Sequence, residues 1–192
     1  MKSRPVVFCF FFIGGLLAAQ TPPATTTPTA TTPAAPSTTS LLAAQQVRAA
    51  MVAGVVNGSV QANAALAQLQ GLTAPMGLPV DPAADFGYAA IDVGHRLIAA
   101  GRPDVAGIFF KTAETSLAAV VLQTPDTQAW NKAQYLQQLA MIRDRYLNNP
   151  VQAMADIEQA LALQPNDALL QQDKAMFVSE HGNLFTGATP QG

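Results

Sequence analysis

The sequence predicts an all-α protein built of stacked antiparallel helical hairpins. Alanine, leucine and glutamine are abundant after Ser40, and no stretch alternates apolar and polar residues as a half-buried strand would. Glycine, proline and asparagine fall together at a few places and divide the chain into segments of helical length. Short connections make consecutive helices antiparallel, so we expect about three hairpins followed by a capping helix.

Residues 1–19 have the composition of a secretory signal peptide. Lys2 and Arg4 give a positive start, an uncharged apolar run follows, and the run ends in the small residues Ala18 and Ala19. It is short for a membrane span, which needs about 20 residues. We therefore expect cleavage, export to the periplasm or out of the cell, and no later membrane insertion. An uncleaved membrane anchor is the alternative, because Leu17 is bulky for its place before a cleavage site.

Residues 20–40 are predicted to form a disordered linker. From Thr21 to Ser40 the chain contains only threonine, proline, alanine and serine. Without a large apolar side chain, such a stretch cannot offset its own chain entropy. The single cysteine, Cys9, lies in the signal segment, so the mature chain would have no disulfide, thiolate metal site or cysteine nucleophile.

Seven helices are expected after the linker, with ends set by the turn residues. The fifth would be the longest of the seven, which run over 41–56, 60–70, 84–100, 104–122, 127–147, 151–163 and 168–180. The first two form an N-terminal hairpin over 41–72, and the others form a repeat domain over 84–180. Residues 181–192 are predicted to be a flexible tail, because they are rich in glycine and polar residues.

The third and fourth predicted helices resemble a tetratricopeptide repeat. The match consists of Gly94, the turn glycine Gly101, and then Ala106, Phe110 and Ala113. The resemblance implies a right-handed solenoid of hairpins. In such a repeat the small residues lie where the two helices cross, and Phe110 fills the space between one hairpin and the next.

The second half of the repeat pattern returns further along the chain. Ala153, Ile157 and Ala160 repeat the second-helix spacing, and Pro165 follows as the family pattern prefers. The spacing between repeats is 47 residues, against about 34 in the standard repeat. The helix before this half is periodic, with one stripe made of Leu136, Leu139, Ala140, Arg143, Tyr146 and Leu147.

The resemblance also implies a groove lined by the first helix of each hairpin. In this register the groove residues are Tyr88, Ile91, His95, Ile98 and Ala99. The function expected from it is that of an exported scaffold or adaptor, which binds a peptide or helix of another protein. Burial in the core is the other interpretation of Ile91 and Ile98. The alternative function is a structural envelope module without an open groove, its groove being filled by its own C-terminal tail.

Catalysis, cofactors and nucleic-acid binding are not expected. Lysine and arginine form no cluster, which binding to phosphates requires. No metal-ligand spacing is found around His95, and the sequence contains no phosphate-binding glycine loop. Ser59 lacks the strand–turn–helix context of a nucleophilic elbow. His181, in the predicted tail, is expected to be exposed to solvent.

The spacing of several charged and aromatic residues predicts where their side chains lie. Asp92 and Arg96 are four residues apart and could pair on one helix. Arg143, Asp144 and Arg145 are expected to form a solvated face. For Trp130, Tyr135 and Tyr146 the sequence favours packing within and between hairpins, with an exposed aromatic patch as the alternative.

Overall fold

The computed structural model describes residues 38–78 and 81–185 of the 192-residue chain. This part contains seven α-helices, one 3-10 helix and no strand, which confirms the all-α class. In chain order the elements are α1 (Thr38–Val56), α2 (Ala62–Gln70), α3 (Pro82–Ala99), α4 (Pro103–Gln123), η1 (Asp126–Gln128), α5 (Ala129–Arg145), α6 (Pro150–Leu163) and α7 (Ala168–Phe185). The predicted signal peptide, most of the predicted linker and the end of the predicted tail lie outside the described residues.

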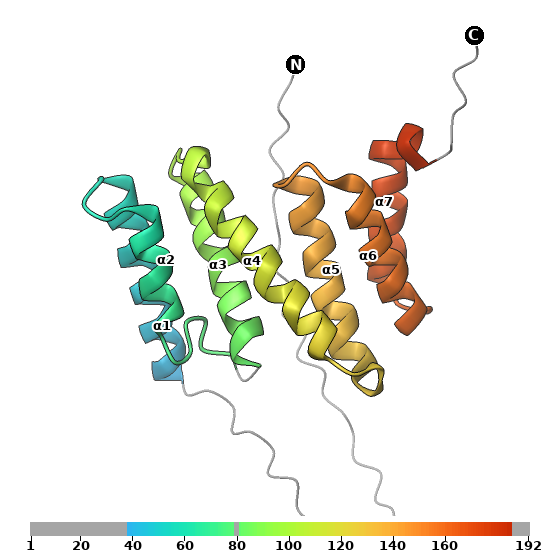
Figure 1. Ribbon diagram of the computed structural model, residues 1–192, viewed down its shortest axis with the longest axis horizontal. Helices are drawn as coiled ribbons and strands as arrows, with labels where there is room; N and C mark the ends of the chain where they lie inside the picture. Colours follow the sequence, from blue (N-terminus) through green and yellow to red (C-terminus); the bar gives the residue numbers. More distant parts are fainter. Residues whose placement is uncertain (1–37, 79–80, 186–192) are drawn as a thin grey trace, which may run out of the picture. The chain divides into compact units, whose positions relative to one another are not determined.

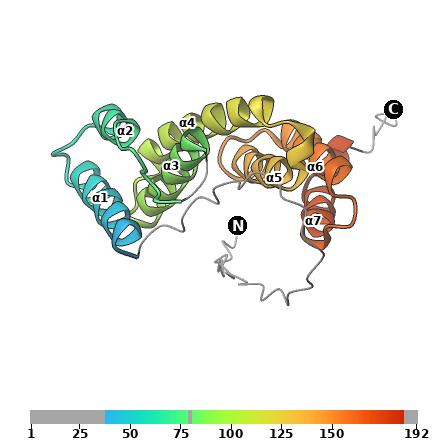
Figure 2. The ribbon, with the colours of Figure 1, turned by 90° about the horizontal axis from the view of Figure 1, so that it is seen from below.

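The helices pack as consecutive pairs, and they follow one another in chain order across Figure 1. The most extensive contacts are those within the α3–α4 and α5–α6 hairpins. Contacts of α4 with α5 and of α6 with α7 join the later helices, and α1 packs on both α2 and α3. Figure 2 shows the same order from below. The predicted packed helical hairpins are therefore present.

The predicted helix ends agree with the structure to within three residues except at the end of α7. That helix continues through a kink at His181 to Phe185, so the predicted start of the tail at residue 181 is wrong. The longest helix is α4 rather than the fifth predicted helix. After Pro125 the chain first makes a 3-10 turn, in which the Gln128 N–H donates to the Pro125 carbonyl at 2.9 Å, and α5 begins later as a result.

The turn between α3 and α4 is closed at Gly101, which has a φ of 76°. The N–H of Arg102 donates to the carbonyl of Leu97 at 2.8 Å, and the N–H of Gly101 donates to that of Ile98 at 3.0 Å. This bond pair is a Schellman motif, which needs a left-handed residue and therefore favours glycine. Pro103 then begins α4, where a missing N–H leaves no helical bond unmade.

The turn between α5 and α6 repeats this chemistry 47 residues later. Asn148 has a φ of 51° at the position that corresponds to Gly101. Asparagine tolerates this region better than other residues with a side chain, apart from aspartate. Pro150 is the first residue of α6, as Pro103 is of α4. Two consecutive hairpins thus share the position of the left-handed residue and of the helix start.

Two glycines of α3 allow α4 to approach closely. A Cβ at Gly94 would lie 2.8 Å from ring carbons of Phe110, and one at Gly87 would lie 2.9 Å from Cγ of Leu117. Phe110 and Leu117 are both fully buried. Gly94 was predicted to lie at such a crossing. Gly87 was not predicted, because its partner is distant in the sequence and belongs to no repeat pattern.

Arg48 of α1 attaches the N-terminal hairpin to α3. Its side chain is 6% exposed, and its Nε donates to Asp92 Oδ2 at 2.6 Å. Its Nη1 donates to the carbonyl of Pro75, in the loop between α2 and α3, at 2.6 Å. A single buried guanidinium therefore connects α1, this loop and α3.

Asp85 holds the same loop from the side of α3. The residue is 2% exposed, and its two carboxylate oxygens accept the backbone N–H groups of Met76 at 2.9 Å and Leu78 at 3.0 Å. Asp81 ends the loop as the N-cap of α3 by accepting the N–H of Ala83 at 2.8 Å. The N-terminal hairpin is consequently fixed against α3 by buried polar contacts.

The central helix α4 is long and apolar enough to span a membrane by length and composition. Within the described residues it is the helix with that property. Its large side chains Phe109, Phe110 and Leu117 are fully buried inside the protein. Core helices of this kind meet the same criterion, so the finding is weak evidence for a membrane span.

Candidate functional site

The five residues predicted to line a groove lie on one side of α3, and together they are called the α3 face: Tyr88, Ile91, His95, Ile98 and Ala99. Ile98 is 39% exposed and Ala99 is also exposed. Tyr88 and His95 are half-buried, whereas Ile91 is only 8% exposed. The α3 face is thus most open near the C-terminal end of the helix, and Ile91 contributes mainly to the core.

Tyr88 and His95 both lie against aromatic residues of the next hairpin. The ring centroids of Tyr88 and Tyr135 are 6.3 Å apart. The His95 ring is 5.3 Å from Tyr146, the residue after α5, and 5.5 Å from Phe110 of α4. Tilted ring pairs at such distances attract each other. These contacts connect α3 to α5 along the α3 face.

Phe110 is the centre of the packing between the two hairpins. Its ring stacks on Tyr146 with the centroids 3.9 Å apart and the planes 8° from parallel. It also lies against Gly94, where an added Cβ would be 2.8 Å from two of its ring carbons. The remaining residues of the repeat pattern fall into two groups. Buried are Ala106, Ala113, Ala153, Ile157 and Ala160, and exposed in turns are Gly101 and Pro165.

The α3 face has two titratable side chains, His95 and Tyr88, and burial shifts the pKa of both. Burial lowers the pKa of His95, although the Asp92 carboxylate opposes the shift. Burial also raises the pKa of Tyr88, with the neighbouring Tyr135 as a lesser cause, so its hydroxyl stays protonated. At the edge of the face Asp92 pairs with Arg96 at 2.9 Å, which confirms the predicted pair.

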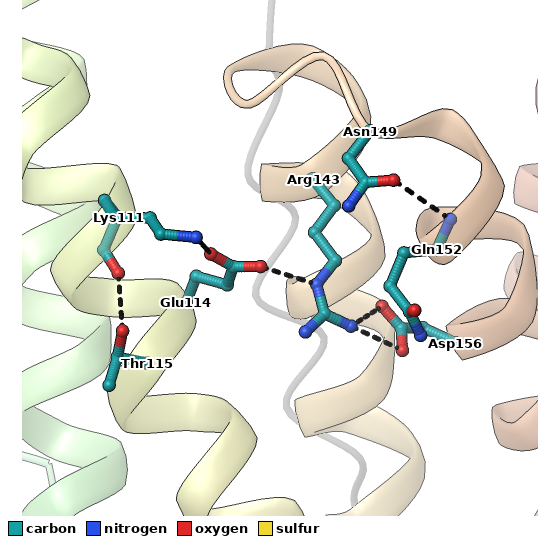
Figure 3. A network of polar contacts seen from close by, with 7 residues as sticks. All are labelled: Lys111, Glu114, Thr115, Arg143, Asn149, Gln152 and Asp156. Carbon is teal, nitrogen blue, oxygen red and sulfur yellow. Dashed lines mark hydrogen bonds and ion pairs between the residues drawn. The ribbon is translucent and has the colours of Figure 1, made fainter.

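A network of charged side chains lies between α4, α5 and α6 (Figure 3). Arg143 donates from Nε to Glu114 Oε1 at 2.9 Å and from Nη1 to Asp156 Oδ2 at 2.6 Å. The side chains of Arg143, Glu114 and Asp156 are 14%, 11% and 4% exposed. Lys111, which is exposed, pairs with Glu114 from the solvent side. One guanidinium therefore bridges carboxylates of two different hairpins.

Burial and pairing act against each other at both carboxylates. Burial alone would raise the pKa of Glu114, but hydrogen bonds from Lys111 and Arg143 outweigh it and hold the pKa below its ordinary value. At Asp156 burial is the stronger effect and raises the pKa, while the Arg143 guanidinium opposes it. Arg143 is the charged partner of Asp156, whereas Glu114 is compensated by both Lys111 and Arg143.

The predicted solvated face of Arg143, Asp144 and Arg145 is wrong for its first two members. Asp144 has a side chain that is only 2% exposed, and it contacts His181 and Arg145. The partners of Arg143 lie on helices 29 and 13 residues away, beyond the reach of a local pattern. A usable signal was present, because Arg143 lies on the apolar stripe of α5, and a charge on a buried stripe indicates a buried ion pair.

A second polar cluster joins α5 to the end of α7. The Nε2 atom of His181 lies 2.6 Å from Asp144 Oδ1, and Arg145 pairs with Glu180 at 2.9 Å. Ligand atoms of Asp144, Glu180 and His181 lie within 4.8 Å of one another, a spacing that a metal ion could use. The guanidinium of Arg145 is in contact with both carboxylates, so it already compensates their charge. His181 is half-buried here, in contrast to the exposed position predicted for it.

The three aromatic residues predicted for packing divide in the structure. Tyr135 is 8% exposed and Tyr146 is half-buried, and both pack against α3 or α4. Trp130, by contrast, is 64% exposed near the start of α5. The packing interpretation is therefore wrong for Trp130.

The α3 face offers a phenol ring, an imidazole and aliphatic side chains. These groups can contact an apolar or proline-containing chain segment and form hydrogen bonds with its backbone.

Comparison of the chain with protein-family models, with curated proteins and with solved structures finds no match.

Proposed function

We propose that the protein is an exported scaffold or adaptor that binds a peptide or helix of another protein across the α3 face. The observation that carries the proposal is the exposure of apolar side chains at the C-terminal end of α3, which is otherwise covered by its neighbours. α3 is covered by α4 and α1, and its rings contact Tyr135 and Tyr146, yet Ile98 remains 39% exposed with Ala99 beside it. Exposed apolar residues beside half-buried aromatic ones are typical of protein contact sites.

The same proposal assigns the fold to the tetratricopeptide-repeat type, as a right-handed solenoid. It is supported by the equivalent turns at Gly101 and Asn148 and by the proline that begins each following helix. It is also supported by Phe110, which packs between two hairpins as that resemblance implies. In such arrays the first helices of the hairpins form the binding surface, and here α3 is one of them.

Export is part of the proposal and follows from the signal-peptide composition of residues 1–19. Binding energy would come from apolar contact with Ile98 and Ala99 and from the exposed edges of Tyr88 and His95. Because Gly94 and Phe110 fix the position of α3, the surface is arranged before a partner arrives, which reduces the entropy lost on binding. No catalytic role and no cofactor are proposed.

A structural envelope module is the second candidate. The observation that favours it is the extent to which the α3 face is already used in packing. Ile91 is 8% exposed, and the rings of Tyr88 and His95 are in contact with Tyr135 and Tyr146. A module of this kind would lose stability, rather than a partner, when the face is altered.

The test compares two isoleucines of equal exposure. Ile98 on the α3 face and Ile108 on α4 are both 39% exposed, so each can be replaced by glutamate at a similar cost in stability. The mature protein and both variants are crosslinked in the envelope of the source cells, and captured proteins are identified. Ile98→Glu should lose a partner that the wild type and Ile108→Glu both capture, with unchanged circular dichroism. Capture of the same partners by all three proteins, or of none reproducibly, would refute the adaptor function.

A further inference from the structure

We propose that Asp144, Glu180 and His181 bind a zinc ion, which attaches the end of α7 to α5. Asp144 and His181 are 37 residues apart in the sequence, and the fold brings them into contact. The ion is structural and takes no part in the adaptor function. The site shares no residue with the α3 face, so this inference does not rest on the proposed function.

Three ligand atoms of suitable kinds already lie together. One ligand atom from each of the three residues lies within 4.8 Å of the others, and Nε2 of His181 is 2.6 Å from Oδ1 of Asp144. With zinc–ligand bonds of about 2.0–2.2 Å, the ligand atoms of a tetrahedral site are about 3.4 Å apart. Small side-chain rotations would widen the His181–Asp144 contact to that distance. The metal would then take the place of the hydrogen that the two atoms share.

The positions of both carboxylates in their helices favour a cation. Asp144 is the residue before the last of α5, and Glu180 directly precedes the kink of α7 at His181. The C-terminal end of a helix carries a partial negative charge, which destabilises a carboxylate and attracts a cation. The side chain of Asp144 is 2% exposed, so water compensates its charge very little.

Arg145 compensates one of the two carboxylate charges and leaves ligand atoms for a metal. Its guanidinium contacts Asp144 Oδ2 at 3.3 Å and Glu180 Oε2 at 2.9 Å. Oε1 of Glu180 has a longer contact of 3.2 Å with the same group, so it can turn to the metal together with Oδ1 of Asp144. With a neutral imidazole the cluster keeps one negative charge. Arg145 would then hold both ligands from the outer side, as hydrogen-bond donors behind metal-bound carboxylates do.

The types of ligand select zinc over calcium and magnesium. An imidazole nitrogen and carboxylate oxygens are zinc ligands, and a site with three protein ligands keeps a fourth position for water. Calcium prefers about six to eight oxygen ligands, and magnesium prefers an octahedron of oxygen atoms. The side chains of His181 and Glu180 are 29% and 39% exposed, so the ion can enter from solvent.

The metal would strengthen a contact that now consists of polar side chains. α7 packs mainly on α6, and it meets α5 through pairs such as that of Gln137 with Asp173 at 2.6 Å. Beyond the kink at His181 the helix continues to Phe185. A zinc ion at the kink would hold this last turn against α5, and we expect it to slow hydrogen exchange in residues 181–185.

Isothermal titration calorimetry with zinc chloride tests the site in the full chain, produced without a histidine tag. Cys9→Ser is present in every variant, because Cys9 is the only thiol and could compete for the metal. We expect one zinc ion per chain. Glu180→Gln and His181→Gln should each weaken binding at least about tenfold, since even a hydrogen-bond partner of a metal ligand contributes 10–100-fold.

Glu158→Gln is the matched control. Glu158 is an exposed carboxylate of α6 that pairs with Lys174, so this variant undergoes the same chemical change outside the cluster and should bind zinc unchanged. Glu180→Gln leaves the His181–Asp144 contact in place. A loss of zinc affinity in that variant with unchanged circular dichroism therefore reports on the ligand and not on the folding of α7.

Several results would overturn this inference. They are the absence of saturable zinc binding, unchanged affinity in Glu180→Gln and His181→Gln, and an equal loss in Glu158→Gln. Calcium binding as tight as zinc binding would indicate an unselective acidic surface, and one zinc ion for two chains would indicate a site between copies. Hydrogen exchange in residues 181–185 that zinc does not slow would refute the attachment of α7.

Discussion

Two glycines in neighbouring helices, Gly94 and Gly107, differ in the space available to an added methyl group. Gly94 in α3 lies under the Phe110 ring, where a Cβ would be 2.8 Å from two ring carbons, and Gly107 in α4 has no atom within 4 Å of the same position. Gly94→Ala should therefore displace the ring from its stack on Tyr146 and lower the free energy of unfolding by about 1–3 kcal/mol. Gly107→Ala should raise it by about 0.5–1 kcal/mol, because alanine is the better helix former.

Urea denaturation followed by circular dichroism measures both changes, and Gly107→Ala is the matched control for Gly94→Ala. The two variants differ only in what the added methyl group meets. Equal stability of the two would mean that the Phe110 ring moves aside without loss, and the close approach of α3 and α4 would then have no energetic role.

His95 is expected to make the stability of the fold depend on pH. Burial lowers its pKa below the ordinary value of 6.5, so the unfolded chain takes up a proton first as the pH falls. Its contribution to stability is therefore complete only well above pH 6.5, and it is lost as the pH falls through that value toward the pKa of the folded state. The free energy of unfolding of the wild type should decrease between about pH 7.5 and pH 5.

His95→Phe is the comparison for this prediction, since it keeps a ring beside the Phe110–Tyr146 stack and removes the titrating group. Urea denaturation at several pH values should give the variant a smaller slope than the wild type over the same interval. A slope that is unchanged in the variant would show that other groups cause the pH dependence.

The charge network connects three helices through a single guanidinium. Arg143→Met should lower the free energy of unfolding by about 3–5 kcal/mol, because Glu114 and Asp156 would keep their burial and lose their shared partner. Replacing all three by apolar residues, as Glu114→Met, Arg143→Met and Asp156→Leu, should recover most of the loss. Chemical denaturation of the single and triple variants tests this. A single variant that costs less than about 1 kcal/mol would indicate that water reaches the network and compensates the carboxylates.

Arg48 attaches the N-terminal hairpin to α3 and to the loop before it. Arg48→Met removes the donor to Asp92 and to the Pro75 carbonyl, while Arg96 remains beside Asp92. Hydrogen exchange should therefore become faster in α1 and α2, with much smaller changes in α5 and α6. Arg145→Met, which removes the guanidinium that pairs with Asp144 and Glu180 between α5 and α7, is the control. Uniform acceleration over all helices would contradict a local attachment.

The sequence determines the helices far better than their mutual contacts. Gly101, Pro103 and Pro150 mark helix ends by local backbone chemistry, and the predicted ends lie close to the observed ones. The contacts of Gly87 and Arg143 involve partners on other helices, so local spacing could not identify them. The residues of the α3 face could be assigned to one side of a helix by periodicity. Their exposure could not, since it depends on the aromatic residues that α4 and α5 bring against them.

Phe110 lies at the interface between the α3–α4 and α5–α6 hairpins. It contacts Gly94 and His95 of one hairpin and Tyr146 of the next, and it is 1% exposed. In arrays of helical hairpins, cooperativity depends on the free energy of the interfaces between neighbours. Phe110→Ala should cost about 3–5 kcal/mol and weaken this interface most of all.

Loss of the interface should separate the unfolding of the two hairpins. Trp130 is the only tryptophan and lies in α5, so its fluorescence reports on the α5–α6 hairpin. Circular dichroism reports on all helices. The two probes should give coincident urea transitions in the wild type and distinct midpoints in Phe110→Ala. Leu136→Ala, a buried substitution on α5, is the control that lowers stability without removing the Phe110–Tyr146 stack. Coincident transitions in Phe110→Ala at reduced stability would mean that the remaining contacts are sufficient to couple the hairpins, among them the Arg143 bridge to Glu114 and Asp156 and the Tyr88–Tyr135 and His95–Tyr146 ring contacts.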